Sequence, residues 1–448
     1  MNIPQHPRSS ARATSELQQR ALGHLASPLY RNAYFLIASA GLTSALGVVF
    51  WAVAAHEYNP ATIGRNSAAI SAMMLVSGVC QLGLNAVLVR YIPRAGSSTR
   101  RLVLLSYAVT AVLSAVVAFA VALSVGSWTP SLGFLGDDGR WLVAFVTATA
   151  AWTIFGLQDS VMIGLRQAQW VPLENSLFSL AKVVLLLLLA ASAPEGGVFI
   201  AWNGPLLIAV ILVNVLIFRR LIPRHGHHSR TSLPASRSLA VFAVGNYLGS
   251  LFFLASTTLL PLLIAAESGP RATAYFFIPW TIAMGLQLVA LNMTTSLTVE
   301  VAFDESKLQE YCRRILAHTL RLVIPMVVAL IAAAPYILRV FGDAYSDEGT
   351  TLLRLLSVAS VPNVVVALGL SVARLQHNGR MVLWIQGAVC ALTLAVSLIL
   401  LPGLGIEGVG IAWLASQVTV AIWLLAGILR PVVMSSAPVA GANRDRRT

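Results

Sequence analysis

Gln81-Leu-Gly-Leu-Asn85 has a counterpart in Gln287-Leu-Val-Ala-Leu-Asn292, 206 residues further along the 448-residue chain (287 − 81). Three more matches recur at nearly this spacing: Pro60 with Pro270 (210 residues), Arg100-Arg101 with Arg313-Arg314 (213), and Glu195-Gly-Gly-Val-Phe-Ile-Ala-Trp202 with Glu407-Gly-Val-Gly-Ile-Ala-Trp413 (212). Self-similarity at a fixed spacing is typical of repeat architectures. Four matches in register therefore predict that the second half of the chain duplicates the first.

The composition places the chain in a lipid bilayer, because 57% of its residues are hydrophobic, only 10% are charged, and its mean hydropathy is +0.78. Crossing about 30 Å of hydrocarbon as a helix takes roughly 20 apolar residues. Twelve runs are long enough, at 32–55, 68–89, 102–125, 141–163, 175–193, 198–218, 239–265, 273–299, 314–337, 352–373, 381–401 and 406–429. We expect an all-α polytopic membrane protein whose twelve transmembrane helices form two pseudo-symmetric six-helix bundles around a central cavity.

The distribution of basic residues predicts the topology. The two tails and the alternate connections between spans hold 23 of the 30 Lys and Arg residues, whereas the opposite connections hold five. Cytoplasmic loops of membrane proteins carry an excess of Lys and Arg. We therefore expect both termini to be cytoplasmic and the protein to be a multi-pass protein of the plasma (inner) membrane. Nucleic acid is not an expected partner, because the basic residues are spread over many short loops.

The predicted organisation has five parts: a cytoplasmic N-terminal tail (1–31), an N-terminal six-helix bundle (32–218), a basic cytoplasmic linker (219–238), a C-terminal six-helix bundle (239–430) and a cytoplasmic C-terminal tail (431–448). The linker contains His225-Gly-His227-His228. Imidazoles bind zinc and nickel, but this spacing matches no recognised cage and nothing acidic lies nearby. We expect no metal site and no cofactor.

Catalysis is not expected from this chain. A membrane enzyme that builds glycans needs acidic groups or a nucleophile in a sizeable aqueous loop, and the longest external connections predicted here, 126–140 and 338–351, are short. The sequence also has no Gly-x-x-x-x-Gly-Lys-Ser/Thr phosphate-binding loop. The short loops favour a transporter.

Three ionisable residues lie within predicted spans: Asp159, Lys182 and Arg321. Charges inside a membrane are costly and usually face a bundle interior or a water-filled cavity. The equivalent positions of the other half are uncharged, which favours a functional role for Lys182 and Arg321 in substrate binding. The alternative for both is that they snorkel toward the membrane surface.

Two further groups complete the candidate site. Asp159 is predicted to act either in coupling or as a structural partner of Arg166 or Lys182. Asn85 and Asn292 occupy matching places in the two halves and are candidates to line a shared substrate cavity. Their alternative role is to join helices through interhelical hydrogen bonds.

Longer motifs resemble a known family. Phe50-Trp51-Ala-Val-Ala-Ala-His56-Glu57-Tyr58-Asn59-Pro60-Ala-Thr-Ile-Gly64 and Leu82-Gly-Leu-Asn85-Ala-Val-Leu-Val-Arg90-Tyr-Ile-Pro93 resemble the opening of the polysaccharide transporter family. Val340-Phe-Gly-Asp-Ala-Tyr345, Leu352-Leu-Arg-Leu-Leu356 and Gly405-Ile-Glu-Gly-Val-Gly-Ile-Ala-Trp413 are similar to its C-terminal half. The resemblance implies the fold of the multidrug/oligosaccharidyl-lipid/polysaccharide (MOP) superfamily, with alternating access.

The function implied by this resemblance is flipping of polyprenyl-diphosphate-linked oligosaccharides, or O-antigen units, for cell-surface polysaccharide or lipopolysaccharide biosynthesis. The expected partners are the lipid-linked glycan, membrane lipids, and a glycan polymerase or glycosyltransferases of the same pathway. A multidrug or small-solute antiporter of the same fold is the alternative, and a membrane glycosyltransferase or polymerase is a distant third. Two intramembrane cations against one acid suit an anionic diphosphate cargo.

Overall fold

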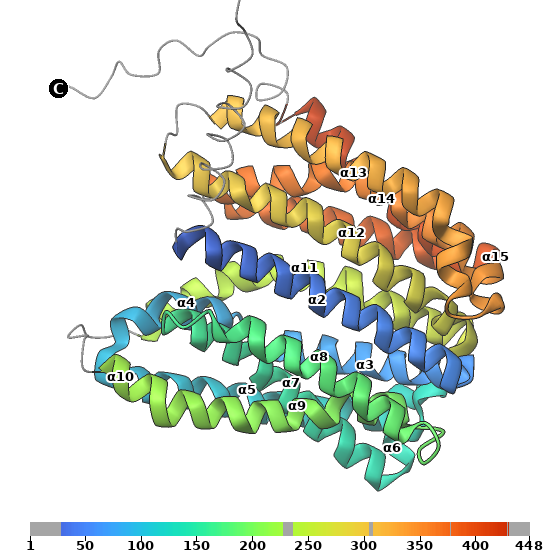
Figure 1. Cartoon of the computed structure of the whole chain (residues 1–448), viewed down its shortest axis with the longest axis horizontal. Coiled ribbons are helices and arrows are strands. Elements are labelled where there is room, and N and C mark those ends of the chain that lie inside the picture. The colour runs from blue at the N-terminus through green and yellow to red at the C-terminus, as the bar shows by residue number, and fades with distance from the viewer. Residues whose placement is uncertain (1–27, 227–235, 304–307, 377, 428, 430–448) are drawn as a thin grey trace, which may run out of the picture.

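The computed structural model describes residues 28–226, 236–303, 308–376, 378–427 and 429, and within these residues all regular structure is helical. Figure 1 shows the helices running side by side along the long axis of the molecule. The longer elements of the first half are α2 (Pro28–Glu57), α3 (Pro60–Cys80), α4 (Leu84–Ala95), α5 (Thr99–Ser124), α7 (Gly139–Gly164), α8 (Trp170–Leu189) and α9 (Gly197–Leu216). Those of the second half are α11 (Ser236–Glu267), α12 (Gly269–Phe303), α13 (Leu308–Arg339), α14 (Asp343–Leu375) and α15 (Gly379–Ala426).

Short elements complete the described chain. They are η1 (Gly96–Ser98), η2 (Val125–Ser127), η3 (Pro130–Leu132), α6 (Phe134–Asp137), η4 (Ile217–Leu221) and α10 (Ile222–Gly226). Each predicted span lies on helical elements, and by length and composition nine helices of the described part can cross a membrane. One of these, α15, contains two predicted spans separated by a sharp bend at Gly405, where φ is 57° and ψ is −144°.

The second predicted span, 68–89, differs from the structure. It is not one helix but the end of α3 and the start of α4, separated at Leu82 and Gly83, where φ is 50° and 69°. Left-handed backbone ends a right-handed helix, and glycine adopts it without steric cost. The continuous hydrophobicity of this stretch conceals the break, so the sequence predicted a single span.

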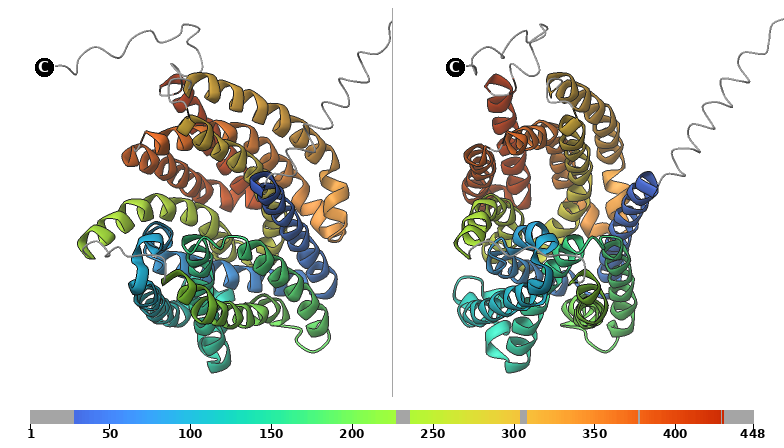
Figure 2. Two further views of the ribbon diagram at one scale, coloured as in Figure 1. Left: turned by 60° about the vertical axis from the view of Figure 1, so that its left-hand side comes forward. Right: turned by 90° about the vertical axis from the view of Figure 1, so that its left-hand side faces the viewer.

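The helices form two lobes, as expected from the duplication. Figure 2 shows the first-half helices, in blue to green, packed beside the second-half helices, in yellow to red. Within the N-terminal lobe α8 packs against α2 and α9, and α5 packs against α7; within the C-terminal lobe α14 packs against α12, α13 and α15. Helix α3 joins the lobes, because it packs against both α11 and α12. The two-bundle architecture is confirmed. Residues 227–235 of the proposed linker lie outside the described chain, so the linker and tail assignments stay predictions.

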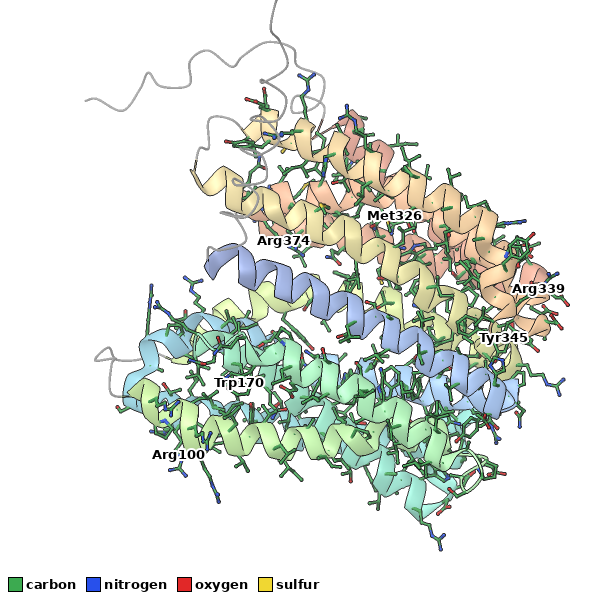
Figure 3. All side chains as sticks on the ribbon, in the orientation of Figure 1. Arg100, Trp170, Met326, Arg339, Tyr345 and Arg374 are labelled. Atoms are coloured by element: carbon green, nitrogen blue, oxygen red, sulfur yellow. The ribbon has the colours of Figure 1, made fainter. Side chains whose placement is uncertain are left out.

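The helical bundle has two ends, each marked by labelled residues. Figure 3 shows Arg100 at one end and Arg339 with Tyr345 at the other. We call the first the Arg100 end. The second is the Pro60 end, because α3 begins there: Pro60 stands in the first turn, and the Asn59 side chain caps the helix by accepting a hydrogen bond of 2.8 Å from the Thr62 backbone N–H. Both residue types are typical of helix starts. The predicted topology makes the Pro60 end external.

Candidate functional site

Contacts between the lobes include a group at the Pro60 end. Gly64 of α3 lies directly against the backbone of Pro270 of α12, leaving no room for a Cβ atom. The ring of Trp51 on α2 lies 4.8 Å from that of Phe277 on α12, centroid to centroid. Nearer the other end, the Tyr247 hydroxyl of α11 donates a hydrogen bond to the Val79 carbonyl. Contacts between α3 and α11 therefore extend along α3 from the Pro60 end toward the Arg100 end.

Lys182 is enclosed within the N-terminal lobe. Its side chain is only 5% exposed, and its Nζ atom lies 3.9 Å from the centroid of the Trp202 ring, 5.3 Å from Phe178 and 5.4 Å from Phe50. A cation over aromatic faces within about 6 Å is stabilised by roughly 2 kcal/mol when desolvated. These three rings come from α9, α8 and α2, so the ammonium group stands where three helices meet, and no carboxylate of the described residues acts on it.

One aromatic layer separates this lysine from the other lobe. Trp202 lies 5.3 Å from Phe50 and 5.8 Å from Trp51, and Trp51 makes the contact with Phe277 described above. In this conformation α2 thus covers Lys182 on the side facing the C-terminal lobe. The ammonium group does not itself line the space between the lobes.

The other predicted substrate residues are not gathered around Lys182. Arg321 is exposed on α13 of the C-terminal lobe. Asn85 is exposed on α4, and its side-chain oxygen accepts a hydrogen bond of 2.9 Å from the neighbouring Ala86 N–H. Asn292 belongs to α12, but its side chain lies outside what the structure describes. A shared pocket built from these four residues stays a prediction.

Asp159 has a neighbour that the sequence did not suggest. Its side chain interacts with the Asn175 amide rather than with Arg166, which is exposed just beyond α7 with a φ of 61°. Asp159 lies close enough to Glu174 for its charge to affect that carboxyl group, and both acids lie close to the Tyr107 hydroxyl. Asp159 Oδ1, both carboxylate oxygens of Glu174 and the Tyr107 hydroxyl are buried without a hydrogen-bond partner among the described residues. We call Tyr107, Asp159, Glu174 and Asn175 the acidic cluster; it joins α5, α7 and α8.

Glu174 was not predicted to lie inside the membrane, because it falls one residue before the fifth predicted span. The fifth predicted span starts at 175, whereas α8 begins at Trp170, so Glu174 lies inside the helix and is 7% exposed. A signal was available in the apolar residues Trp170, Val171 and Leu173 that precede it. Extending the apolar run to include them would have identified a fourth intramembrane ionisable residue.

Solved structures with this arrangement of helices are transporters. One described as the inward-facing conformation of a multidrug resistance MATE family transporter of the MOP superfamily aligns with a TM-score of 0.68 and 14% identity, over 88% of this chain and 96% of that one. The lipid II flippase MurJ, in an inward closed conformation, aligns with a TM-score of 0.68 and 12% identity, over 88% and 87%. The fold is that of the MOP superfamily.

A further MOP structure, from Pyrococcus furiosus, is described as having a binding pocket of reversed polarity that suggests a different function; it aligns with a TM-score of 0.56 and 15% identity, over 89% of this chain and 92% of that one. No family model and no curated protein matches this sequence. These likenesses show the fold alone.

Proposed function

We propose that this protein flips a polyprenyl-diphosphate-linked oligosaccharide across the plasma (inner) membrane, for cell-surface polysaccharide biosynthesis. Alternating access of the two MOP lobes would carry the glycan, and glycosyltransferases or a polymerase of the same pathway would supply or consume it. The fold supports this proposal, because MurJ, with the same fold, is described as a lipid II flippase.

The observation that carries the proposal is the buried ammonium group of Lys182. Taking a cation out of water costs several kcal/mol unless a partner compensates for it. Three aromatic rings offset part of this cost, and no carboxylate in the described part of the chain acts on the lysine. A diphosphate would supply the missing negative charge, whereas a cationic cargo would be repelled.

Movement of α2 is the step that would bring cargo and lysine together. Phe50 and Trp51 of α2 stand between Lys182 and the C-terminal lobe. When the lobes move apart and the contact between Trp51 and Phe277 is lost, α2 would be free to tilt away from α8. The ammonium group would then be exposed during only part of the transport cycle, which favours binding that is reversible.

A second candidate function is antiport of a cationic small solute, and the acidic cluster favours it. Asp159 and Glu174 are carboxyl groups inside the N-terminal lobe without a cationic partner in the described chain. Such groups are suited to bind a coupling cation or a cationic solute. A structure described as the MATE multidrug transporter DinF-BH aligns with a TM-score of 0.64 and 15% identity, over 91% of this chain and 96% of that one.

Proteoliposomes containing the full chain distinguish the two functions. We expect a fluorescent polyprenyl-diphosphate oligosaccharide to become protected from a membrane-impermeant glycosidase faster than in protein-free vesicles. Lys182→Gln should slow this protection roughly tenfold, the equivalent of 1.4 kcal/mol, and Arg321→Gln should slow it as well. Arg140→Gln, which changes an exposed arginine at the Pro60 end, is the matched control.

The same vesicles test the antiporter. Accumulation of a cationic dye, without any flipping of the glycolipid, would overturn the flippase proposal. Normal flipping by both Lys182→Gln and Arg321→Gln would leave the flippase standing but remove these residues from its binding site. Thermal unfolding of each variant identifies losses that come only from misfolding.

A further inference from the structure

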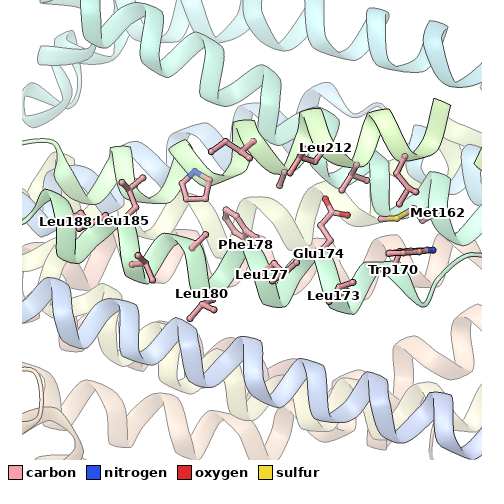
Figure 4. Close-up of a pocket in the computed structure, with 17 residues that line it drawn as sticks. Met162, Trp170, Leu173, Glu174, Leu177, Phe178, Leu180, Leu185, Leu188 and Leu212 are labelled. Carbon is pink, nitrogen blue, oxygen red and sulfur yellow. The ribbon is translucent and has the colours of Figure 1, made fainter. Parts of the chain in front are cut away.

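A membrane-facing groove runs between α8 and α9. It has a volume of about 690 Å³ and opens along one side of the N-terminal lobe (Figure 4). The groove is lined by Trp170, Glu174, Phe178 and Pro205, by Met162 of α7, and by aliphatic side chains of α8 and α9. Its size lies within the range of roughly 300–1,000 Å³ that is usual for ligand sites.

The rim of this α8–α9 groove is suited to a lipid chain. Leu177 is 58% exposed, Leu188 69% and Leu212 63%. Exposed leucines on a transmembrane helix face hydrocarbon. From Glu174 to Leu188 the groove extends about 21 Å at 1.5 Å per residue, and one leaflet of hydrocarbon is about 15 Å thick. A single acyl chain of a lipid in one leaflet can therefore lie along most of the groove.

Glu174 is the only ionisable residue among those that line the groove. Figure 4 shows its carboxylate pointing from α8 across the groove toward α9. The side chain is 7% exposed, and neither oxygen has a hydrogen-bond partner among the described residues. Asp159 adds a second negative charge close behind it. A buried carboxylate without a partner is costly, so this end of the groove is electrostatically complementary to a cation that carries N–H donors.

The position of Glu174 specifies which lipid supplies that cation. It lies one turn inside Trp170, and tryptophan is typical of the headgroup level of a membrane. Arg166 is exposed four residues beyond Met162, and Arg219 and Arg220 are exposed within four residues beyond Leu216, at the same end of the groove. Arginine binds phosphate through several parallel hydrogen bonds. An acidic group flanked by arginines fits a headgroup with a phosphate and a primary ammonium.

We propose that the α8–α9 groove binds one phosphatidylethanolamine molecule. One acyl chain lies between α8 and α9, the ammonium group donates hydrogen bonds to Glu174, and the phosphate meets the flanking arginines. This site is separate from Lys182, which does not line the groove and is enclosed among the rings inside the lobe. The proposal does not rest on Lys182 or on the glycolipid cargo.

Native mass spectrometry of the purified full-length protein tests the proposal. Phosphatidylethanolamine and phosphatidylcholine with identical acyl chains are compared, because the quaternary ammonium of phosphatidylcholine has no N–H to donate. We expect the wild-type protein to bind phosphatidylethanolamine at least about tenfold more tightly, which corresponds to 1.4 kcal/mol. Glu174→Gln should reduce this preference to less than about twofold. Glu195→Gln, which changes an exposed carboxylate, should leave it intact.

A second variant keeps the test valid if Glu174→Gln does not fold. Ile208→Trp places an indole in the groove while leaving the carboxylate in place, and should abolish phosphatidylethanolamine binding. Val112→Trp on α5 is its control, since Val112 is 64% exposed and Ile208 61%. Soluble phosphoethanolamine should not compete, because it lacks the chain.

Several results would overturn the proposal. They are equal binding of the two lipids by the wild-type protein, an unchanged preference in Glu174→Gln, and unchanged binding in Ile208→Trp. If the protein bound dodecylamine but not phosphatidylethanolamine, the proposal would also be overturned. The groove would then be assigned to single-chain amines.

Discussion

Gly64 and Pro270 fix the closest approach of the two lobes at the Pro60 end: a Cβ atom on Gly64 would overlap the carbonyl oxygen of Pro270. The contact joins α3 to α12, one helix from each lobe. Since a backbone carbonyl cannot rotate away as a long side chain can, closure of this end depends on residue 64 having no side chain.

Gly64→Ala should therefore push the lobes apart at the Pro60 end. We expect the distance between spin labels on Glu57 and Glu267, which are exposed at the ends of α2 and α11, to broaden toward longer values in double electron–electron resonance. Gly285→Ala is the matched control, because a Cβ on Gly285 of α12 meets nothing within 4 Å. An unchanged distance distribution in Gly64→Ala would show that the interface yields without opening.

Asn66 should be among the residues most important for stability. It is 2% exposed, and its Nδ2 group donates hydrogen bonds to the carbonyls of Thr62 (2.8 Å) and Glu195 (2.9 Å), while its Oδ1 accepts one from the Phe199 N–H at the start of α9 (3.0 Å). Asn66→Leu leaves the Phe199 donor and the Glu195 acceptor without this partner, so the free energy of unfolding should fall by roughly 1–3 kcal/mol. Thermal unfolding in detergent measures the loss.

Asn85→Leu is the comparison for that experiment. Asn85 is exposed, and among the described residues its side chain bonds only to the Ala86 backbone. The apparent melting temperature of Asn85→Leu should therefore stay within error of the wild type. Equal melting temperatures for Asn66→Leu and the wild type would mean that water or rearranged backbone replaces the amide.

Asp159 and Glu174 should destabilise each other. Neutralising either one, as Asp159→Asn or Glu174→Gln, removes one of two neighbouring buried carboxyl groups. At a pH where both are ionised it should raise the free energy of unfolding by roughly 1–3 kcal/mol in detergent free of phosphatidylethanolamine. The double variant should gain less than the sum, because each change relieves the same repulsion. Strict additivity in this thermodynamic cycle would show that the two carboxyl groups do not interact.

Reporter fusions test the orientation in the membrane. Fusions after Arg230 and Thr448 should report a cytoplasmic location, and one after Asp138 an external one, because the tails and alternate predicted connections hold 23 basic residues and the opposite connections five. An external signal from Thr448 would require an odd number of crossings.

The sequence predicted the architecture because hydrophobic length is a local property. Each span could be recognised from its own composition. The bend at Gly405 of α15 lies between two runs that were predicted as separate spans. The break at Leu82 and Gly83 could not be recognised in this way, since it depends on backbone angles within an uninterrupted apolar stretch.

The surroundings of the charged residues depend instead on tertiary contacts. Lys182 was predicted to bind substrate, and that role stays a prediction. The rings around it come from positions 50, 178 and 202, on three helices, and no periodicity relates them. Asp159 was predicted to act in coupling or to pair with Arg166 or Lys182, and its role stays a prediction. The structure places the Asn175 side chain of α8 beside it. A residue's depth in the membrane can be read from sequence; its neighbours on other helices cannot.

The bend at Gly405 has a mechanical consequence. The last two spans are joined through a single left-handed residue, so the chain has no slack there. Two helices joined through a single residue cannot slide past each other or change their spacing at the point where they are joined. In the proposed transport cycle this hairpin would therefore move as one unit, and widening of the C-terminal lobe at that end would occur between this hairpin and the other helices.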